Sequence, residues 1–445
     1  MTIREPSRST RRTMVKTVVL AGAGLMVEAC AGVDRAPPKL PLWQPLAGGL
    51  DIRGTRFFRD GRPLLLSGFN HWAAGALARE GNDRGWDQVR RDLDQLQGLG
   101  VNSIRVMAAM EGPDSEPWRV VPSIQPSPGH YDLAGVAGLL RLADEARRRR
   151  LVVIFTLNDF WPWSGGMAQY VAWAVGSPIP YPPPQPGGSF SAFSAFAARF
   201  YVTERAKAMF RDYVRFLVPQ LNANPAVIWE LANEPRGMMN VGAYRSWIDA
   251  TARLIKSLAP GQLVTTGSEG ETSSPAEAGL DVVEDHRSPA VDFVTCHLWA
   301  QNWGWVDAAC GTKEFERALQ LARDYVERHA AMAARLAKPI LLEEFGFPRD
   351  AGSFDPAAPT TFRDRYFEAM YALVASLALE TPMLGIFPWA WSGSSRPRRP
   401  GGAWRPGDPL TGDPPHEPQG WYGIYESDST IEVIRDGCAA LGLRA

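Results

Sequence analysis

The stretch Val227-Ile-Trp-Glu-Leu-Ala-Asn-Glu-Pro235 begins as an apolar run and ends in polar residues. A buried parallel strand has an apolar body, and its polar tip lies where the strand leaves the sheet. Pro235 cannot continue a strand ladder because its backbone nitrogen carries no proton. The pattern therefore predicts a strand over Val227–Glu234, with Asn233 and Glu234 at its carboxyl end.

A second stretch of the same kind is Pro339-Ile-Leu-Leu-Glu-Glu-Phe-Gly346, which also ends in carboxylates. The carboxyl ends of parallel barrel strands meet at one face, where α/β barrels build their active sites. Two carboxylates that face each other across such a site are what retaining glycoside hydrolysis requires. The two strands together therefore indicate a glycosidase active site.

The rest of the chain alternates between apolar runs and helical periodicity, which predicts an α/β fold. The other six predicted strands are Pro63–Phe69, Asn102–Met107, Leu151–Leu157, Leu263–Ser268, Val291–Trp299 and Leu384–Trp391. The predicted helices are Trp86–Leu99, Leu133–Arg150, Phe190–Leu221, Tyr244–Leu258, Phe315–Leu336, Thr361–Leu379 and Glu432–Leu441. Eight strands with helices between them predict a single (β/α)8 TIM barrel with long βα loops over residues 41–445.

The amino-acid composition indicates which kinds of molecule the protein is expected to bind. The 445 residues carry a formal net charge of −1, which gives no indication of a nucleic-acid partner or of an anionic membrane surface. Sixteen tryptophans offer flat apolar faces for stacking on sugar rings. No protein partner is implied, and the expected partner is a polysaccharide.

Residues 1–40 have the pattern of an export signal followed by a linker. A basic segment, Ser9–Lys16, precedes a ten-residue apolar run, Val18–Val27, which is too short to span a bilayer. The segment Thr10–Lys16 resembles a twin-arginine signal. The stretch Val27-Glu-Ala-Cys30 resembles a lipoprotein box with a lipid anchor at Cys30, although Glu28 departs from it, so ordinary signal cleavage stays open. The protein is expected to be exported: periplasmic, anchored to a membrane, or extracellular.

Metal and cofactor signals are missing from the sequence. The six histidines are scattered, no pair of the four cysteines has zinc-ligand spacing, and there is no glycine-rich phosphate loop. We therefore expect neither a metal nor a cofactor. Cys296 and Cys310 could form a disulfide after export or stay free thiols.

Several ordered motifs resemble glycoside hydrolase family 5, and in particular its endo-β-1,4-mannanase branch. Besides Asn233-Glu-Pro235 and Glu344-Phe-Gly346, they are Gly68-Phe-Asn-His-Trp72, Asn102-Ser-Ile-Arg-Val106, Asn158-Asp-Phe-Trp161, Gly165–Val171, Thr265–Gly270, His297–Trp303 and Trp389-Ala-Trp-Ser-Gly393. An Asn-Glu-Pro tripeptide alone is weak evidence. The full set, in order across eight predicted strands, is specific.

The resemblance implies roles for both catalytic carboxylates. Glu234 would be the general acid/base, whose pKa its surroundings must raise, and Glu344 would be the ionised nucleophile. Arg105 would hold the nucleophile, and Asn233 would bind the 2-hydroxyl of the reacting sugar. The remaining implied roles are a polar network at His297, an indole N–H contact at Trp299 where relatives carry Tyr beside the nucleophile, a stacking floor at Trp389, and cleft positions at Trp72, Asn158 and Trp161.

Two neighbouring carboxylates compete for these roles. Successive strand residues face opposite ways, so only one of Glu343 and Glu344 should enter the site, and Glu343 is then expected to face the helical layer. Glu230 lies deeper on the strand of Glu234, where an interior hydrogen-bonded carboxylate is expected.

The sequence thus predicts a retaining endo-β-1,4-mannanase acting on mannan, glucomannan or galactomannan. A β-1,4-glucanase or an exo-β-mannosidase on the same fold, or a sugar-binding barrel without catalysis, are the alternatives.

Overall fold

The computed structural model of the chain describes residues 46–307 and 309–442. The predicted export signal and linker, with Cys30, lie outside these residues. The structure therefore describes the predicted catalytic domain from residue 46 onward.

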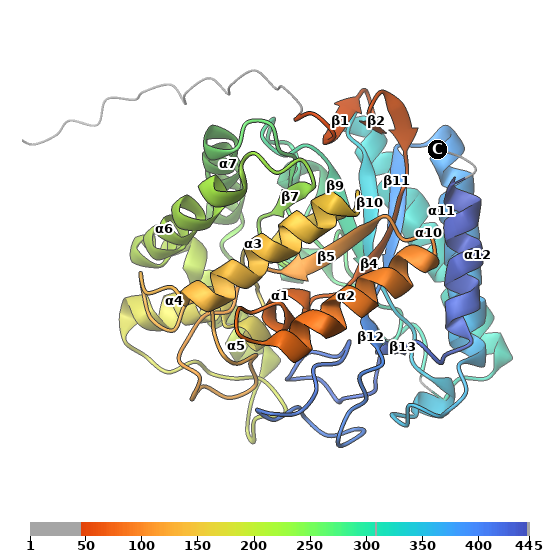
Figure 1. Ribbon diagram of the computed structural model, residues 1–445. Coiled ribbons are helices and arrows are strands. Elements are labelled where there is room, and N and C mark those ends of the chain that lie inside the picture. Colours follow the sequence, from red (N-terminus) through yellow and green to blue (C-terminus); the bar gives the residue numbers. More distant parts are fainter. Residues whose placement is uncertain (1–45, 308, 443–445) are drawn as a thin grey trace, which may run out of the picture. The chain divides into compact units, whose positions relative to one another are not determined.

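A parallel barrel forms the centre of the domain (Figure 1). Its eight strands are β4 (Leu66–Asn70), β5 (Ser103–Met107), β6 (Val152–Thr156), β7 (Val227–Glu230), β8 (Val264–Thr265), β9 (Val294–Leu298), β10 (Ile340–Phe345) and β11 (Met383–Pro388). They pair in the order β8-β7-β6-β5-β4-β11-β10-β9. The two ends of that order meet, because the Asp292 backbone N–H donates to the Val264 carbonyl at 2.8 Å. The predicted (β/α)8 fold is confirmed.

Helices surround the barrel at the expected places (Figure 1). The longer ones are α2 (Asp83–Gly98), α3 (Leu133–Arg148), α4 (Gly166–Val175), α6 (Glu204–Leu221), α7 (Val241–Leu258), α10 (Thr312–Arg335), α11 (Thr361–Glu380) and α12 (Thr430–Gly442). Shorter helices are α1 (Ala74–Leu77), α5 (Phe190–Ala197), α8 (Pro275–Ala278) and α9 (Val282–Asp285).

One predicted helix is divided. The segment Phe190–Leu221 consists of α5, a 3-10 turn over Ala198–Val202, and α6. The 3-10 turn buries the rings of Phe200 and Tyr201, which pack on each other with centroids 5.7 Å apart. Burial of these two rings decides the bend, which helical periodicity alone does not reveal.

A three-stranded antiparallel sheet precedes the barrel, and the predicted strand Pro63–Phe69 is divided between this sheet and β4. The sheet comprises β1 (Leu50–Arg53), β2 (Arg56–Arg59) and β3 (Arg62–Leu64), and Figure 1 shows β1 and β2 at the end of the barrel opposite the long loops. Phe57 of β2 is buried and packs edge-on against Phe293, with ring centroids 5.4 Å apart. It joins the apolar cluster inside the barrel, so the small sheet closes the amino-terminal end.

Strand β10 contains an irregularity that changes which side chains enter the barrel. Along its ladder with β9, Leu342 pairs with Cys296 and Glu344 pairs with the next residue, His297. Glu343 is therefore an extra residue, as in a β-bulge, and bulges re-aim side chains beside active sites. The expectation that Glu343 faces the helical layer is wrong: its carboxylate lies 3.5 Å from His297 Nε2 and 3.9 Å from Arg105 Nε, inside the barrel.

Candidate active site

A cleft of about 860 Å³ lies at the carboxyl ends of the barrel strands. Six of the predicted site residues line it: Asn233, Glu234, Glu344, Trp161, Trp299 and Trp389. They come from four strands and from the loop after β6, so only the folded barrel brings them together. Aromatic walls with a few convergent polar groups are typical of a ligand site.

Glu234 lies at the end of a chain segment that continues β7. The segment leaves regular strand geometry after Glu230, yet the backbone N–H groups of Leu231 and Glu234 still donate to the carbonyls of Thr265 and Gly267. Glu234 itself has a φ of +48°, a left-handed conformation that non-glycine residues rarely adopt and that is concentrated at functional sites. The barrel thus holds this carboxylate at a fixed position above β7.

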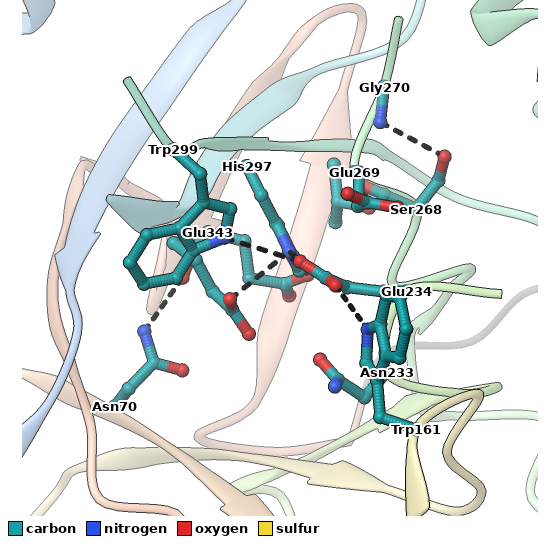
Figure 2. Close-up of polar contacts among 12 residues, drawn as sticks. Asn70, Trp161, Asn233, Glu234, Ser268, Glu269, Gly270, His297, Trp299 and Glu343 are labelled. Atoms are coloured by element: carbon teal, nitrogen blue, oxygen red, sulfur yellow. Dashed lines mark hydrogen bonds and ion pairs between the residues drawn. The ribbon is translucent and has the colours of Figure 1, made fainter. Parts of the chain in front are cut away.

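Three side chains donate hydrogen bonds to the Glu234 carboxylate (Figure 2). Trp161 Nε1 donates to Oε2 at 2.6 Å, while His297 Nδ1 and Trp299 Nε1 reach Oε1 at 2.8 and 3.3 Å. The indole of Trp299 therefore contacts the predicted acid/base. The expectation that it would replace a phenol contact to the nucleophile is wrong, because the ring points across the mouth toward Glu234.

Glu344 enters the cleft from the bulged end of β10. Its Oε1 accepts from Arg105 Nη1, and its Oε2 lies 3.2 Å from His297 Nδ1. One carboxylate oxygen of Glu344, one of Glu234 and a His297 ring nitrogen all lie within 4.8 Å of one another. Such a short distance between the nearest oxygens is compatible with the separation of about 5–5.5 Å between the carboxyl groups of retaining enzymes.

Arg105 lies beneath the cleft and joins several partners. It forms a two-pronged ion pair with Glu230, with Nε–Oε2 and Nη2–Oε1 distances of 2.7 Å, and it also donates to the side-chain oxygens of Asn233 and Asn70 at 2.9 and 3.1 Å. The expected interior hydrogen-bonded role of Glu230 is confirmed. Arg105 thereby fixes Asn233 and Glu344 relative to each other.

The pKa of Glu234 differs from the expectation. Burial raises the pKa of Glu344 to about 7, and the charges of His297 and Arg105 offset this only in part. Burial acts to raise the pKa of Glu234 as well, but the hydrogen bond and charge of His297, the charge of Arg236 and the hydrogen bond of Trp161 together lower it to about 2. In the protein without substrate, the shared proton of this closely coupled pair therefore favours Glu344. The predicted raised pKa of Glu234 is wrong for this state, because donors surround its carboxylate.

Four predicted site residues do not line the cleft. Arg105 and His297 act from behind the two carboxylates. Trp72 is buried and donates from Nε1 to the Gly412 carbonyl at 2.9 Å, so it holds a loop and offers no stacking face. Asn158 is also buried, and its backbone carbonyl accepts from the Asn233 N–H at 2.9 Å, so it supports a cleft residue. Neither residue is among those that line the cleft, although Trp72 borders a small neighbouring cavity with the cleft residues Asn233 and Trp389.

Sequence reasoning missed other cleft residues. Arg236 lies 4.8 Å above the Trp161 ring and pairs with the buried Glu269 at 2.6 and 2.8 Å. His416 and Glu417, from the long loop after β11, also line the cleft, and neither His416 Nδ1 nor Glu417 Oε2 has a hydrogen-bond partner among the described residues. Arg236 directly follows the Asn-Glu-Pro motif, which was a usable signal, whereas the loop carries none.

The trio of Glu234, His297 and Glu344 has a spacing that metal sites also show. Here an Arg105 N–H already donates to Glu344, and the indole and imidazole donors already satisfy Glu234. We assign the trio to acid–base chemistry and not to metal binding. Of the cysteines, Cys296 and Cys310 are free thiols, which decides between the two alternatives that the sequence left open.

Comparison with known proteins agrees with this geometry. Residues 49–444 match the model of the GH family 5 beta-mannosidase-like family. The chain belongs to this family of glycoside hydrolases.

The individual relatives are only moderately similar to this chain in sequence. Mannan endo-1,4-beta-mannosidase 4 of Oryza sativa is 28% identical over 82% of this chain and 77% of its own. A further rice relative, numbered 5 in the same series, is 31% identical over 73% of this chain and 66% of its own, so the chain spans slightly less than two thirds of that protein.

Among solved structures, the glycoside hydrolase family 5 mannosidase of Rhizomucor miehei is 34% identical, with a TM-score of 0.82, and covers 89% of this chain and 98% of its own. The endo-β-1,4-mannanase of Thermotoga petrophila, 23% identical with a TM-score of 0.62, shares the fold.

Proposed function

We propose that this chain is a retaining glycoside hydrolase that cleaves internal β-1,4-mannosidic bonds in mannan-type polysaccharides, with Glu344 as nucleophile and Glu234 as acid/base. The observation that carries the proposal is a pair of carboxylates, each with an oxygen within 4.8 Å of one oxygen of the other, in an aromatic cleft. The names of the rice relatives support mannan as the substrate class, and the R. miehei mannosidase has been solved with mannosyl-fructose.

The reaction takes two displacements. Glu344 attacks the anomeric carbon while Glu234 gives a proton to the leaving oxygen, which leaves a glycosyl-enzyme ester. Glu234, now ionised, then takes a proton from water, which attacks the same carbon and releases Glu344. Trp389 would stack on the reacting sugar, and Asn233 would bind its 2-hydroxyl.

Product analysis tests the proposal. We expect the purified protein to release manno-oligosaccharides of several lengths from unbranched mannan, with the anomeric configuration retained in the first products. The control substrate is carboxymethyl cellulose, which a β-1,4-glucanase would cleave in preference. Binding of mannan without any bond cleavage would instead support a sugar-binding barrel without catalysis.

A second candidate function is removal of single mannosyl units from a chain end, and the shape of the cleft favours it. The described lining residues belong to the segments from β6 onward, and none comes from the loops after β4 and β5. Trp72, at the end of β4, is instead covered by the loop that carries His416 and Glu417. A sugar chain could then continue on the Glu234 side, where the leaving group lies, but not past Trp389.

The two candidates differ in what they release from one substrate. Mannopentaose reduced at its reducing end yields mannose as the first product of an exo-acting enzyme, and internal fragments from an endo-acting one. Chromatography of the products over time distinguishes the two modes of action, because both give similar mixtures late in the reaction. Replacement of Glu417 by Gln should weaken the binding of substrate more in an exo-acting enzyme than in an endo-acting one. In an exo-acting enzyme, the closed end of the cleft must bind the terminal hydroxyls of the sugar chain.

We propose in addition that the protein is exported and that residues 1–29 are removed, on the sequence pattern alone. Within the described residues, no helix combines the length and the apolar character needed to cross a membrane. Mass spectrometry of the native N-terminus tests the proposal. A lipid-modified Cys30 supports an anchored enzyme, an unmodified later residue supports ordinary cleavage, and an intact N-terminus contradicts export.

A further inference from the structure

Glu343 is a buried carboxylate with an unusual environment. Its side chain is fully buried, and neither of its oxygens accepts a hydrogen bond among the described residues. Its charged neighbours are His297 Nε2 at 3.5 Å and Arg105 Nε at 3.9 Å. Burying a carboxylate is costly unless it is compensated, so the bulge that turns it inward needs an explanation.

The imidazole of His297 lies between Glu343 and Glu234 (Figure 2), and it also contacts Glu344. Its Nε2 faces Glu343, while its Nδ1 lies 2.8 Å from Glu234 and 3.2 Å from Glu344. An imidazole with carboxylates at both nitrogens is stabilised with a proton on each, because both N–H groups then face an anion. The ring is itself fully buried, so water does not supply this compensation.

We propose that Glu343 is a positioning residue that, through His297, keeps a proton next to the catalytic pair and allows it to pass between Glu344 and Glu234. The inference deepens the proposed function and rests on it, because it explains how an ionised Glu234 becomes the acid. His297 gives its Nδ1 proton to Glu234, and the same nitrogen then takes the proton of Glu344. The result is an ionised nucleophile, a protonated acid and an unchanged imidazolium.

The surrounding charges agree with a stored proton. Burial lowers the pKa of His297, but Glu344, Glu234 and Glu343 together raise it to about 10. The groups that face this ring or its carboxylate partners are Arg105 from β5, Asp159 after β6, Glu230 from β7, Arg236 and Glu269 beside Glu234, Glu343 and Glu344 from β10, and His416 and Glu417 from the long loop. The carboxyl groups among them, with Glu234, outnumber the cations Arg105, Arg236 and His297, and this excess of acid groups is what holds protons at neutral pH.

The test is Glu343→Gln, which keeps the shape of the side chain and removes its charge. With one anion fewer, His297 and both catalytic carboxylates lose their protons more readily, so each pKa falls. We expect the bell-shaped pH profile of kcat/KM to move to lower pH by about one to three units, the range for a charge at this distance. Nitrogen NMR of labelled histidines should show His297 titrating at lower pH by a similar amount, with His297→Asn used to assign its signal.

Two variants control the test. Glu343→Asp retains the charge and should recover most of the wild-type pH profile. Glu111→Gln replaces another buried carboxyl group, which accepts from the Gly166 N–H and does not line the cleft, so it should leave the profile in place. Thermal melting of each variant checks that it is folded.

Unchanged His297 titration and an unchanged pH profile in folded Glu343→Gln would overturn the inference. A uniform loss of kcat/KM at every pH, without a shift, would also overturn it, since a purely structural role predicts that pattern. The NMR titration needs no substrate, so it separates this inference from the proposed function, which fails instead if the wild-type protein cleaves no mannan.

Discussion

Arg105 and Glu230 form a two-pronged ion pair in the interior of the barrel, with both N–O distances at 2.7 Å. The side chains are 4% and 0% exposed, so water contributes almost nothing to their solvation. The pair leaves one guanidinium nitrogen, Nη1, directed at Glu344. Glu230 thus determines where the positive charge beside the predicted nucleophile lies.

Replacement of Glu230 by Ala should destabilise the protein. Removing one partner of a buried ion pair leaves the other charge unpaired, which costs about 3–5 kcal/mol in the free energy of unfolding. Glu230→Gln keeps two polar atoms near Arg105 and should cost less. Urea denaturation measures both, and an equal, small effect of the two variants would show that Arg105 does not depend on this partner.

Alanine variants of the two proposed catalytic carboxylates should lose activity in different ways. Glu344→Ala should lower kcat on mannan by roughly 10⁴-fold or more, as expected for removal of a nucleophile, and added azide could give a product of inverted configuration. Glu234→Ala should lower it by about 10²–10⁴-fold, but should spare the first step on aryl mannosides with good leaving groups. Azide should then restore turnover with retained configuration.

Glu343→Ala is the control for this pair. If it, and not Glu344→Ala, abolishes activity in a still-folded protein, the nucleophile must be moved by one residue. Because the bulge places both carboxylates inside the barrel, this experiment also tests the register of β10.

Trp161→Phe should move the acidic limb of the kcat/KM profile to higher pH, because in the free protein Glu234 is the member of the pair that takes up the second proton. The indole N–H bonds the ionised form of Glu234 at 2.6 Å and contributes to lowering its pKa to about 2. Without that bond the pKa of Glu234 rises, so its protonated form persists to higher pH. A hydrogen bond to a charged group of about 1.5–3 kcal/mol corresponds to a shift of about one to two pH units.

The matched control is Trp303→Phe, which also removes an indole from the cleft but no bond to Glu234. It should change KM without moving the acidic limb. An acidic limb that stays in place or moves toward lower pH in Trp161→Phe would contradict the conclusion that the Trp161 bond lowers the pKa of Glu234.

Gly68→Ala should destabilise the barrel. A Cβ at Gly68 would lie 2.0 Å from the buried ring of Phe387, which the packed barrel interior cannot move far. We expect a loss of at least about 1–3 kcal/mol of unfolding free energy, as for other overpacked cores. Gly98→Ala in α2, where a Cβ meets nothing within 4 Å, should not destabilise the protein, and thermal or urea unfolding compares the two.

The sequence by itself determined the barrel and the two catalytic carboxylates of the proposed mechanism. The spacing of apolar residues along the chain indicates which residues are buried. A local segment such as Val227–Pro235 is therefore enough to predict its own strand and the polar residues that follow it. The motifs before and after these strands were also sufficient to identify the family. These signals are local, and neighbouring residues are enough to produce them.

Only the tertiary structure decided how the site is organised. The inward turn of Glu343 depends on a bulge in the ladder between β9 and β10, which strand alternation cannot reveal. Trp72 and Trp299 have the same ring chemistry, but one holds a loop and the other contacts Glu234, because different distant segments reach them. The pKa values of Glu234 and Glu344 depend on burial and on charges from several strands, so they exist only once the barrel has closed.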